Sequence, residues 1–459
     1  MLVSEIINIT NGKLLSGNPK IEIDLSCISS DSRTIKKGDF FLPLKGRNFN
    51  GENFIKDAFR KGAIGTLTEG KGSRVKGQGK LVIHVKDTTE ALQKIAHHHR
   101  MKFKIPVIGI TGSNGKTTVK DMISTVLSSK YNVLKNEGTK NNHIGVPQTI
   151  LKLKKPHDAC VLEMGTNHKG EIRLLADIAR PDIVVITNIG PSHLQFLKDL
   201  KGVYESKKEI FSFLKKGSPA VLNGDDRYLS GVKSEKFRII HFGFENSNEF
   251  YASHVSTEKG RIKFLLNGKK PFTLNMIGVH NVYNALAAIA LARNFGLSYE
   301  SIKRRLASYV PTYMRLNIKN ISGVAIIDDA YNSNPLSMSC AIEAIKSYPA
   351  RSRWIVSADM LELGKKEDDF HDLIGEEVAK GMFDGLITFG NLSKHTYLTA
   401  IKNGMPKNRV WHCVSHEEIA SILKRVAKSG DAVLIKGSRS MSMEEVIKKF
   451  GKQETRNKR

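Results

Sequence analysis

The stretch Val107-Ile-Gly-Ile-Thr-Gly-Ser-Asn-Gly-Lys-Thr-Thr118 decides the fold of the central part of this chain. An uninterrupted apolar run, typical of a strand buried on both faces of a parallel sheet, leads into a glycine-rich turn and then into a predicted helix over 116–129. Such a turn directs backbone N–H groups and a helix N-terminus at a phosphate chain. The sequence therefore predicts a nucleotide-binding α/β domain around this loop.

The residue types of the loop indicate how the phosphates are held. The backbone must bend with positive φ and approach the anion closely, which favours glycine. Lys116 is expected to neutralise the β- and γ-phosphates, and the Thr117 hydroxyl to bind Mg²⁺. Ile110 stands where the usual pattern has its first glycine, so an ordinary Gly/Ser turn with an exposed lysine is the alternative. The predicted nucleotide-binding residues here are Gly112, Ser113, Asn114, Gly115, Lys116, Thr117 and Thr118.

Outward from the loop, the same central region alternates strands and helices. Fully apolar runs are typical of a buried parallel sheet, whereas the less regular section 236–275 is typical of antiparallel strands. The other expected elements are strands at 159–164 and 183–188 and helices at 281–294 and 298–309.

Two further α/β units flank the central one. The first has expected strands at 21–25, 39–44 and 80–85 and helices at 52–61 and 88–102; the last has strands at 324–328, 353–357, 385–389 and 432–436. Pro106 precedes a new apolar strand, which places a boundary near 104. We predict three domains: a small N-terminal α/β domain (1–104), a central P-loop ATPase-like parallel-sheet domain (105–315) and a C-terminal Rossmann-like α/β domain (316–459).

Composition restricts the class of protein less than the loop does. The chain has 459 residues and a net charge of +27, from 72 Lys+Arg and 45 Asp+Glu. The basic residues are spread along the chain except at Thr455–Arg459, so a polyanionic small substrate explains the charge as well as nucleic acid does. The four cysteines show no metal-ligand or redox spacing, and the last eight residues are expected to be disordered.

No apolar run is long enough to span a membrane, and Met1–Thr10 lacks the pattern of a secretory signal. We therefore expect a cytoplasmic protein.

A carboxylate is expected near the Mg²⁺. Glu163 ends a buried strand and precedes a glycine, a position where ligands bind in open α/β sheets. His193 follows the next strand at the same edge of the sheet, although an isolated loop histidine is more often a surface residue. The adjacent Lys207 and Lys208, taken alone, indicate a solvated helix face.

At this point the chain resembles the Mur ligases, a family that builds the peptide stem of bacterial cell-wall precursors. Thr111–Thr118 is similar to the family's ATP loop, Leu162–Gly165 to its Mg²⁺-binding strand end, and Thr187–Leu194 to its histidine loop. The segment Ser206–Phe211 falls where the family carries a carbamylated lysine. The resemblance implies that Lys207 reacts with CO₂ and, with His193, binds a second Mg²⁺.

The resemblance extends to the adenine site and the C-terminal domain. Gly278–Ala285 is similar to the adenine-binding helix start, which implies roles for His280, Asn281 and Asn284; from the residues alone, Asn281 is equally a helix cap and Asn284 a surface residue. Arg315 and Asp329 are implied nucleotide contacts. The segment 328–338 resembles the family member that adds a dipeptide, which implies that Tyr331, Asn332 and Asn334 face it. Residues 357–364, with Phe370 and His371, match a pattern of the same member, which implies that this loop helps to form the acceptor pocket.

The N-terminal matches imply a uridine-nucleotide site. Ser30, Asp31, Ser32 and Arg33 are similar to the family's uridine motif, and Gly46–Phe54 to its second loop, although Glu52 stands where the family usually has His. Thr139–Pro147 resembles the loop that receives the UDP-sugar peptide, which implies contacts from Asn141 and Asn142. Thr139 departs from the usual Asn.

The resemblance implies ATP-dependent ligation of D-alanyl-D-alanine to UDP-N-acetylmuramoyl-tripeptide through an acyl phosphate, by a monomer that acts on small molecules. Lys116, Lys207 and His193 are the implied catalytic residues; Thr117, Glu163, His193 and Lys207 are the implied ligands of two Mg²⁺ ions. The alternatives are another Mur-type or folylpolyglutamate-type ligase, a nucleic-acid-dependent P-loop ATPase, and a catalytically silent nucleotide-binding scaffold. The segment 329–338 argues against the other ligases.

Overall fold

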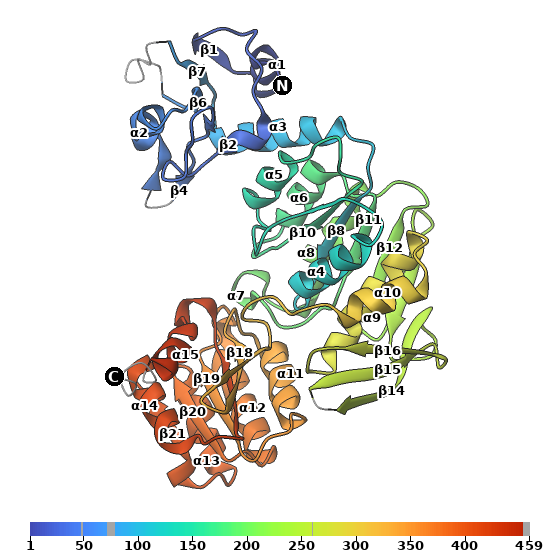
Figure 1. The fold of residues 1–459 in the computed structure, drawn as a ribbon, viewed down its shortest axis with the longest axis vertical. Helices are drawn as coiled ribbons and strands as arrows, with labels where there is room; N and C mark the ends of the chain where they lie inside the picture. Colours follow the sequence, from blue (N-terminus) through green and yellow to red (C-terminus); the bar gives the residue numbers. More distant parts are fainter. Residues whose placement is uncertain (47–48, 71–78, 259, 453–459) are drawn as a thin grey trace.

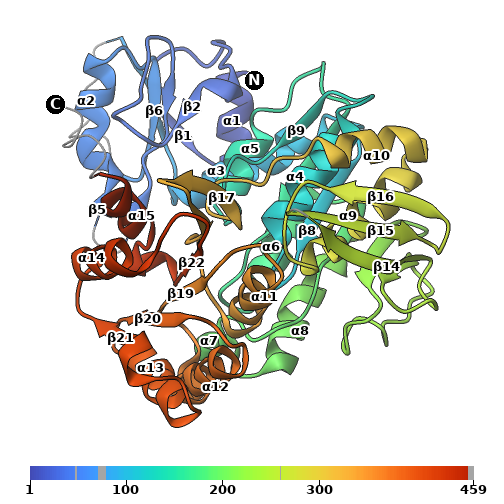
Figure 2. The same cartoon turned by 60° about the horizontal axis from the view of Figure 1, so that its bottom comes forward.

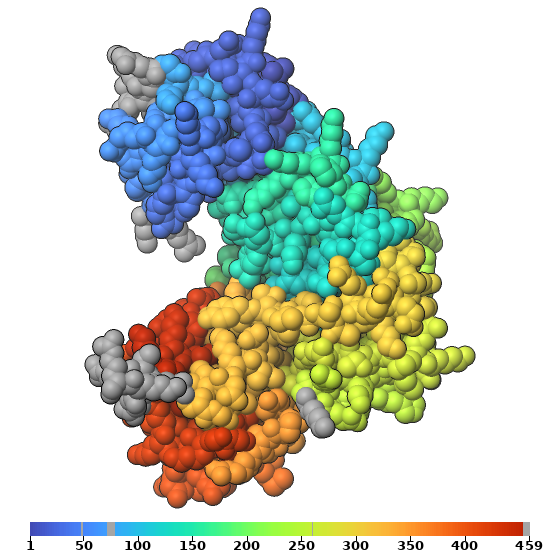
Figure 3. Space-filling view, in the orientation of Figure 1, coloured from blue at the N-terminus to red at the C-terminus, as the bar shows by residue number. Residues whose placement is uncertain are grey.

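The computed structural model describes residues 1–46, 49–70, 79–258 and 260–452. It shows three α/β domains arranged along an arc, with the central domain between the other two (Figure 1). A hollow separates the N-terminal and C-terminal domains on one side of the molecule (Figure 3). The predicted fold class is confirmed. The boundaries near 104 and 315 stay predictions.

The N-terminal sheet has the strand order β1-β7-β6-β3-β2. Its strands are β1 (Lys13–Ser16), β2 (Ile28–Ser29), β3 (Phe40–Phe41), β6 (Gly65–Thr68) and β7 (Leu81–His84), beside the helices α1 (Val3–Thr10), α2 (Ile55–Arg60) and α3 (Thr88–Met101). The strands β4 (Lys45–Gly46) and β5 (Phe49–Asn50) pair antiparallel as a separate two-stranded sheet.

Three N-terminal predictions need correction. The strand at 21–25 is wrong: Glu22 makes an isolated bridge to Leu2, and a 3₁₀ helix begins at Leu25 because Asp24 accepts a hydrogen bond from the Ser26 N–H. The strand at 39–44 is reduced to β3. The helix at 52–61 is 3₁₀ over Gly51–Phe54 before it becomes α2.

The central sheet has the order β16-β15-β14-β13-β12-β11-β8-β10-β9. Its strands are β8 (Val107–Thr111), β9 (Val133–Lys135), β10 (Ala159–Glu163), β11 (Ile183–Ile186), β12 (Pro219–Asn223), β13 (Arg238–Gly243), β14 (Phe250–Glu258), β15 (Arg261–Leu266) and β16 (Lys270–Leu274). Strand β8 lies between β10 and β11, both parallel to it, so their carboxyl ends meet at one edge. The antiparallel prediction holds for β14–β16 but is wrong for β13, which pairs in parallel with β12 and β14.

Helices cover both faces of the central sheet. On one face, α4 (Lys116–Leu127) packs against α9 (His280–Asn294) and α10 (Tyr299–Ala307), where Figure 2 shows them together. On the other face lie α5 (Gly145–Ile150), α6 (Glu171–Ala179), α7 (Leu194–Leu197) and α8 (Leu200–Lys208), and α3 packs against α5 and α6. The apolar runs of the strands therefore contribute to two cores, one on each face.

The C-terminal sheet has the order β17-β18-β22-β19-β20-β21 and is parallel except for β17. Its strands are β17 (Asn317–Ile321), β18 (Val324–Asp329), β19 (Arg353–Ala358), β20 (Gly385–Phe389), β21 (Val410–Cys413) and β22 (Ala432–Lys436). One face carries α11 (Pro335–Lys346), α12 (Glu367–Lys380) and α13 (Ser393–Lys402); the other carries α14 (His416–Val426) and α15 (Glu444–Gly451).

Within the described part of the chain, no helix is long and apolar enough to cross a membrane. All four thiols are free; Cys160 and Cys413 are buried, and Cys27 and Cys340 are partly buried. Residues 453–459, which hold nearly all of the tail predicted to be disordered, lie outside the described residues.

Candidate functional site

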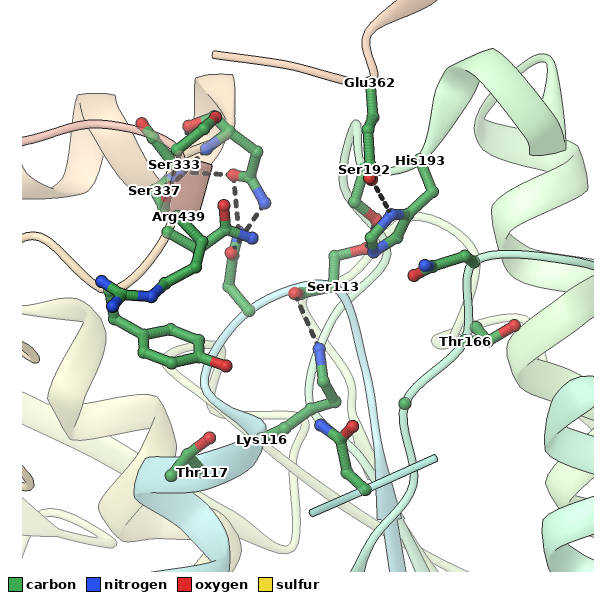
Figure 4. Close-up of a pocket in the computed structure, with 18 of the residues that line it drawn as sticks. Ser113, Lys116, Thr117, Thr166, Ser192, His193, Ser333, Ser337, Glu362 and Arg439 are labelled. Carbon is green, nitrogen blue, oxygen red and sulfur yellow. Dashed lines mark hydrogen bonds and ion pairs between the residues drawn. The ribbon is translucent and has the colours of Figure 1, made fainter. Parts of the chain in front are cut away.

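A cavity of about 660 Å³ lies where the carboxyl edge of the central sheet meets the C-terminal domain. Figure 4 shows side chains from both domains directed into it. The predicted site residues that line it are Ser113, Asn114, Gly115, Lys116, Thr117, Thr118, Asn141, Asn142, Glu163, His193, Arg315, Tyr331, Asn332 and Asn334. Residues more than 200 positions apart in sequence thus share one site.

The phosphate loop has the backbone that the sequence predicts. Gly112 and Gly115 have φ of 146° and 80°, conformations that side chains rarely adopt. A Cβ at Gly112 would collide with the Thr187 hydroxyl, and one at Gly115 with the side-chain oxygen of Asn284. The glycines are therefore required by close packing as well as by backbone conformation.

Lys116 lies folded over its own loop. Its ammonium donates to the backbone oxygens of Gly112 at 2.8 Å and Ser113 at 3.1 Å, inside the cavity (Figure 4). Burial lowers the pKa of Lys116, the nearby Glu163 carboxylate raises it, and Arg315 lowers it further. This cation is held by carbonyl groups that an incoming anion can replace.

Thr117 and Glu163 lie side by side at the edge of the sheet. The Thr117 hydroxyl donates to Glu163 Oε2 at 2.8 Å, and Asn141 donates to Oε1 at 2.7 Å. The side chain of Asn136 brackets the same strand end, because it accepts from the Glu163 N–H and donates to its carbonyl oxygen. The carboxylate is buried and its direction is fixed.

Sequence reasoning missed Lys120, one turn beyond Thr117. Its buried ammonium donates to the carbonyl oxygens of Asn136 at 3.0 Å and Gly138 at 2.9 Å. It lies 3.7 Å from Asp121 and 4.0 Å from Glu163. Lysine is rarely fully buried, and its place on the apolar side of α4 was the available signal.

His193 contacts the C-terminal domain. Its Nδ1 lies 2.5 Å from Oε2 of Glu362, and this contact lowers the pKa of the carboxyl group (Figure 4). Glu362 belongs to the segment 357–364, so this part of the expected pocket segment does line the cavity. The predicted surface alternative for His193 is not what the structure shows, because the ring is partly buried between domains.

Lys207 is the largest departure from what its local sequence indicates. It is buried within α8, whereas the next lysine, Lys208, makes a surface ion pair with Glu205. Burial, and then the positive charge of Lys116, bring the pKa of Lys207 well below its usual value of 10.5. Among the described residues the Lys207 ammonium has no hydrogen-bond or ion-pair partner. It does not line the cavity itself.

The start of α9 packs behind the phosphate loop. Asn281 donates to the Ile277 carbonyl oxygen at 2.8 Å and accepts from Asn284 at 2.9 Å. Both asparagines are buried, so the cap and surface alternatives are wrong: Val279 is the N-cap, and Asn284 contacts Gly115. Burial lowers the pKa of His280 to about 4 and keeps this imidazole neutral.

A second lysine that sequence reasoning missed, Lys436, fixes polar groups of the C-terminal segment 328–338. Lys436, which ends β22, donates to Asp329 Oδ2 at 2.5 Å and to the Asn332 carbonyl oxygen at 2.9 Å. Asp329 Oδ1 also accepts from the Leu316 N–H. Asp329 is thereby engaged by the protein itself and does not line the cavity.

Arg315 and Asn334 link the domains at the cavity. The Arg315 guanidinium lies 4.0 Å from the Tyr331 ring centroid. Asn334 caps α11 and exchanges two side-chain hydrogen bonds with Asn114 of the phosphate loop, at 2.9 and 3.2 Å. The hydroxyl of Ser333 lines the cavity, is buried and has no hydrogen-bond partner among the described residues.

The predicted uridine residues lie away from this cavity, on the N-terminal domain. Arg33 pairs with Asp31, which lowers the pKa of that carboxyl to about 2, and Ser30 accepts from Gln148 of the central domain at 2.7 Å. Glu52 accepts from Thr68 and from two backbone N–H groups of the following loop. Ser32 also lies outside the cavity, and Arg47 and Asn48 of the second loop lie outside the described residues.

The chain matches three domain families in order along its length. Residues 24–100 match the Mur ligase family catalytic domain, 110–292 the Mur ligase middle domain, and 314–439 the glutamate ligase domain of Mur ligases.

Relatives match nearly end to end. The UDP-N-acetylmuramoyl-tripeptide–D-alanyl-D-alanine ligase of Bacillus subtilis is 37% identical over 97% of both chains, and that of Escherichia coli 32% over 97% of both. Among solved structures, MurF of Acinetobacter baumannii superposes with a TM-score of 0.89 at 27% identity, over 98% of this chain and 99% of that one. MurF ligase of Thermotoga maritima, in complex with ADP, gives 0.84 at 29% identity, over 95% and 100%.

A phosphate loop at the carboxyl edge of a parallel sheet, facing a separate α/β domain across one cavity, defines a three-domain P-loop enzyme. The matches specify the family within that class. The chain belongs to the Mur ligase family.

Proposed function

We propose that this chain joins D-alanyl-D-alanine to UDP-N-acetylmuramoyl-tripeptide with ATP as the energy source, in peptidoglycan precursor synthesis. Full-length similarity to ligases of that name supports the substrates. The observation that carries the proposal is the meeting of the phosphate loop and the segment 331–334 in one cavity, joined by the Asn114–Asn334 pair. A γ-phosphate and an acceptor amine can meet there.

ATP is proposed to bind with its phosphates on the loop. The N–H groups at the start of α4 and the Lys116 ammonium supply positive charge near the γ-phosphate, where the bond to the β–γ bridging oxygen breaks. Asn284, at the start of α9, packs against Gly115. The neutral imidazole of His280 and the guanidinium of Arg315 are proposed nucleotide contacts. Asp329 is proposed to reach the nucleotide after leaving Lys436.

Mg²⁺ fits the residues present at one position and fits a second after modification. Thr117 and Glu163 are oxygen ligands in hydrogen-bond contact, and Mg²⁺ is commonly bound by one or two carboxylates together with substrate phosphates. Within the described residues, no three His, Cys, Asp or Glu side chains cluster as a ready-made metal site. When bound, Mg²⁺ neutralises charge developing on the phosphoryl oxygens.

Carbamylation of Lys207 is proposed to supply the carboxylate group that the second Mg²⁺ position needs. The nitrogen of a neutral amine forms a bond to the carbon of CO₂ and releases a proton to solvent, which gives a carbamate, and burial favours the neutral form of this lysine by lowering its pKa. The product is an anion near Lys116, so the positive charge that disfavours a protonated Lys207 favours the carbamate. His193 and modified Lys207 are then the proposed ligands of a second Mg²⁺.

The acceptor and donor are proposed to enter from opposite domains. Tyr331, Asn332 and Asn334 would hold the dipeptide, with Asn141 and Asn142 near the tripeptide carboxylate. Ser30, Asp31, Ser32 and Arg33 would hold the uridine nucleotide at the far end of the donor. The hollow between the outer domains leaves room for this extended substrate (Figure 3).

The reaction proceeds in two displacements. A carboxylate oxygen of the tripeptide attacks the γ-phosphorus, and the bond to the β–γ bridging oxygen breaks, which releases ADP and leaves an acyl phosphate. The dipeptide amine then attacks the acyl carbon, loses a proton, and expels phosphate. Closure about the proposed hinges near 104 and 315 would keep water from the acyl phosphate.

Phosphate release measured with UDP-N-acetylmuramoyl-tripeptide tests the function directly. D-Ala-D-Ala should support release and single amino acids or glutamate should not; the reverse would indicate another amino-acid ligase. DNA or RNA should leave the ATPase rate unchanged, and stimulation would favour the nucleic-acid-dependent enzyme. Lys116→Ala should lower the rate by about 10³-fold or more. Near-normal ADP formation by Lys116→Ala would contradict the site.

A further inference from the structure

The His193–Glu362 contact connects two domains at the place where the metal is proposed to bind. His193 precedes α7 in the loop after β11, and Glu362 lies in the loop after β19. The side chains meet at 2.5 Å (Figure 4). The Glu362 backbone oxygen also accepts from the Gln195 N–H at 3.1 Å. The side chain and the backbone of Glu362 therefore both contact the start of α7, which His193 caps.

Both members of the pair have unusual backbones. His193 has φ of 53° and Glu362 has φ of 64°, a left-handed conformation that non-glycine residues rarely adopt. Such conformations persist where the surrounding structure holds them, and they are common at functional sites. Here the two strained residues face each other across a domain boundary.

The contact determines which ring nitrogen of His193 is available. A carboxylate at Nδ1 favours the tautomer that carries its proton there, and this leaves the lone pair of Nε2 free. Metal-bound histidines commonly donate their other N–H to a carboxylate in this way. Glu362 therefore prepares the imidazole for a metal rather than competing for the same nitrogen.

We propose that Glu362 is a positioning residue: it orients His193 toward the second Mg²⁺, so that this metal site is complete when the C-terminal domain is docked. The inference rests on the proposed function. A separate contact supports the coupling, because Asn334 of the same domain pairs with Asn114 in the phosphate loop. Docking of one domain thus reaches both the phosphate loop and the metal-site histidine.

Mn²⁺ binding in the presence of a non-hydrolysable ATP analogue and bicarbonate tests this. Electron paramagnetic resonance gives the affinity, and pulsed measurements detect histidine nitrogen on Mn²⁺. Glu362→Ala should weaken the second Mn²⁺ about tenfold and reduce the nitrogen signal. Glu362→Gln should be intermediate, because its amide oxygen still accepts from Nδ1–H. Asn334→Ala should also weaken this site, and unchanged affinity would show that docking of the C-terminal domain does not complete it.

Glu343→Gln is the matched control, since it removes a negative charge from the same domain at an exposed residue paired with Lys346. It should bind Mn²⁺ as the unmodified protein does. Unchanged affinity and nitrogen signal in Glu362→Ala would overturn the inference, and tighter binding would show that Glu362 withholds the histidine. Thermal melting identifies a misfolded variant, and the isosteric Glu362→Gln then decides the question.

The two proposals fail differently. If the unmodified protein binds neither Mn²⁺ nor the analogue, the proposed function fails. If it binds both and the Glu362 variants match it, the positioning role alone fails.

Discussion

Two lysines of the central domain are almost completely buried, and their surroundings differ in kind. Lys120 is 1% exposed, and its ammonium lies among two carbonyl oxygens and the carboxylates of Asp121 and Glu163. Lys207 is 2% exposed and, among the described residues, has no such partner. A buried cation with partners is structural, whereas one without them is better neutralised or chemically changed. The comparison shows that two equally buried lysines can differ in role: Lys120 stabilises the fold, whereas Lys207 is available for chemical modification.

The largest effect should come from removing the amine of Lys207. Lys207→Ala loses the proposed carbamate, so the rate of phosphate release should fall by about 10³-fold. Lys207→Arg should not restore it, because the guanidinium stays protonated. Steady-state assays in bicarbonate measure both. If Lys207→Ala kept activity within a factor of about two of the unmodified protein, Lys207 would have no role in the reaction.

The next effect should be on stability, at the other lysine. Lys120→Met leaves Glu163 and two buried carbonyl oxygens without a cation, so the free energy of unfolding should fall by about 3 kcal/mol. Denaturant titration measures this. Lys207→Met in CO₂-free buffer is the matched control and should be neutral or stabilising. Equal losses in both variants would show that the two environments do not differ.

The pH dependence of stability should also distinguish them by its size, because burial lowers the pKa of both lysines but brings that of Lys207 well below its usual value. The pKa of Lys207 is lower in the folded protein than its usual 10.5, so between those values the unfolded chain binds the extra proton. Stability should therefore rise with pH in that window, by up to about 1.4 kcal/mol per unit. Lys207→Met should lose this slope in CO₂-free denaturant titrations at pH 7, 8 and 9. Identical slopes would mean that Lys207 is not held neutral.

The smallest effect should come from Lys208, one position further along α8. It is partly exposed and pairs with Glu205 at 2.9 Å on the surface. Lys208→Ala should change the free energy of unfolding by less than about 0.5 kcal/mol and leave phosphate release unchanged. Melting and rate measurements beside Lys207→Ala sharpen the comparison, because the two variants differ by one residue. A large loss of stability or of phosphate release in Lys208→Ala would show that substitutions anywhere in α8 are disruptive, rather than that Lys207 has a specific role.

Local sequence explains the phosphate loop almost completely. The strand Val107–Thr111, the two glycines with positive φ and the helix start at Lys116 all follow from residue type and order. The positions of the ends of β10 and β11 could also be predicted from sequence, because the apolar runs of a parallel sheet place Glu163 and the loop of His193 at one edge.

The remaining site residues depend on partners distant in sequence. The pair Lys207-Lys208 looks like a solvated face, and only tertiary packing buries the first and leaves the second partly exposed. Lys120 and Lys436 were missed for the same reason, because their partners come from other strands or loops. Glu362 lies in the segment 357–364 that was expected at the pocket, but its contact with His193 was not predicted, since the two residues belong to different domains. The family resemblance directed attention to Lys207, but its environment could not be read from neighbouring residues.

By itself the sequence determined the three α/β units, the nucleotide loop and the edge of the sheet where ligands gather. These features depend on local backbone preference and hydrophobic period, which act over a few residues. Tertiary structure alone decided which buried charges have partners and which histidine nitrogen is free. Those properties depend on desolvation and on short-range contacts between distant segments, which no local pattern encodes.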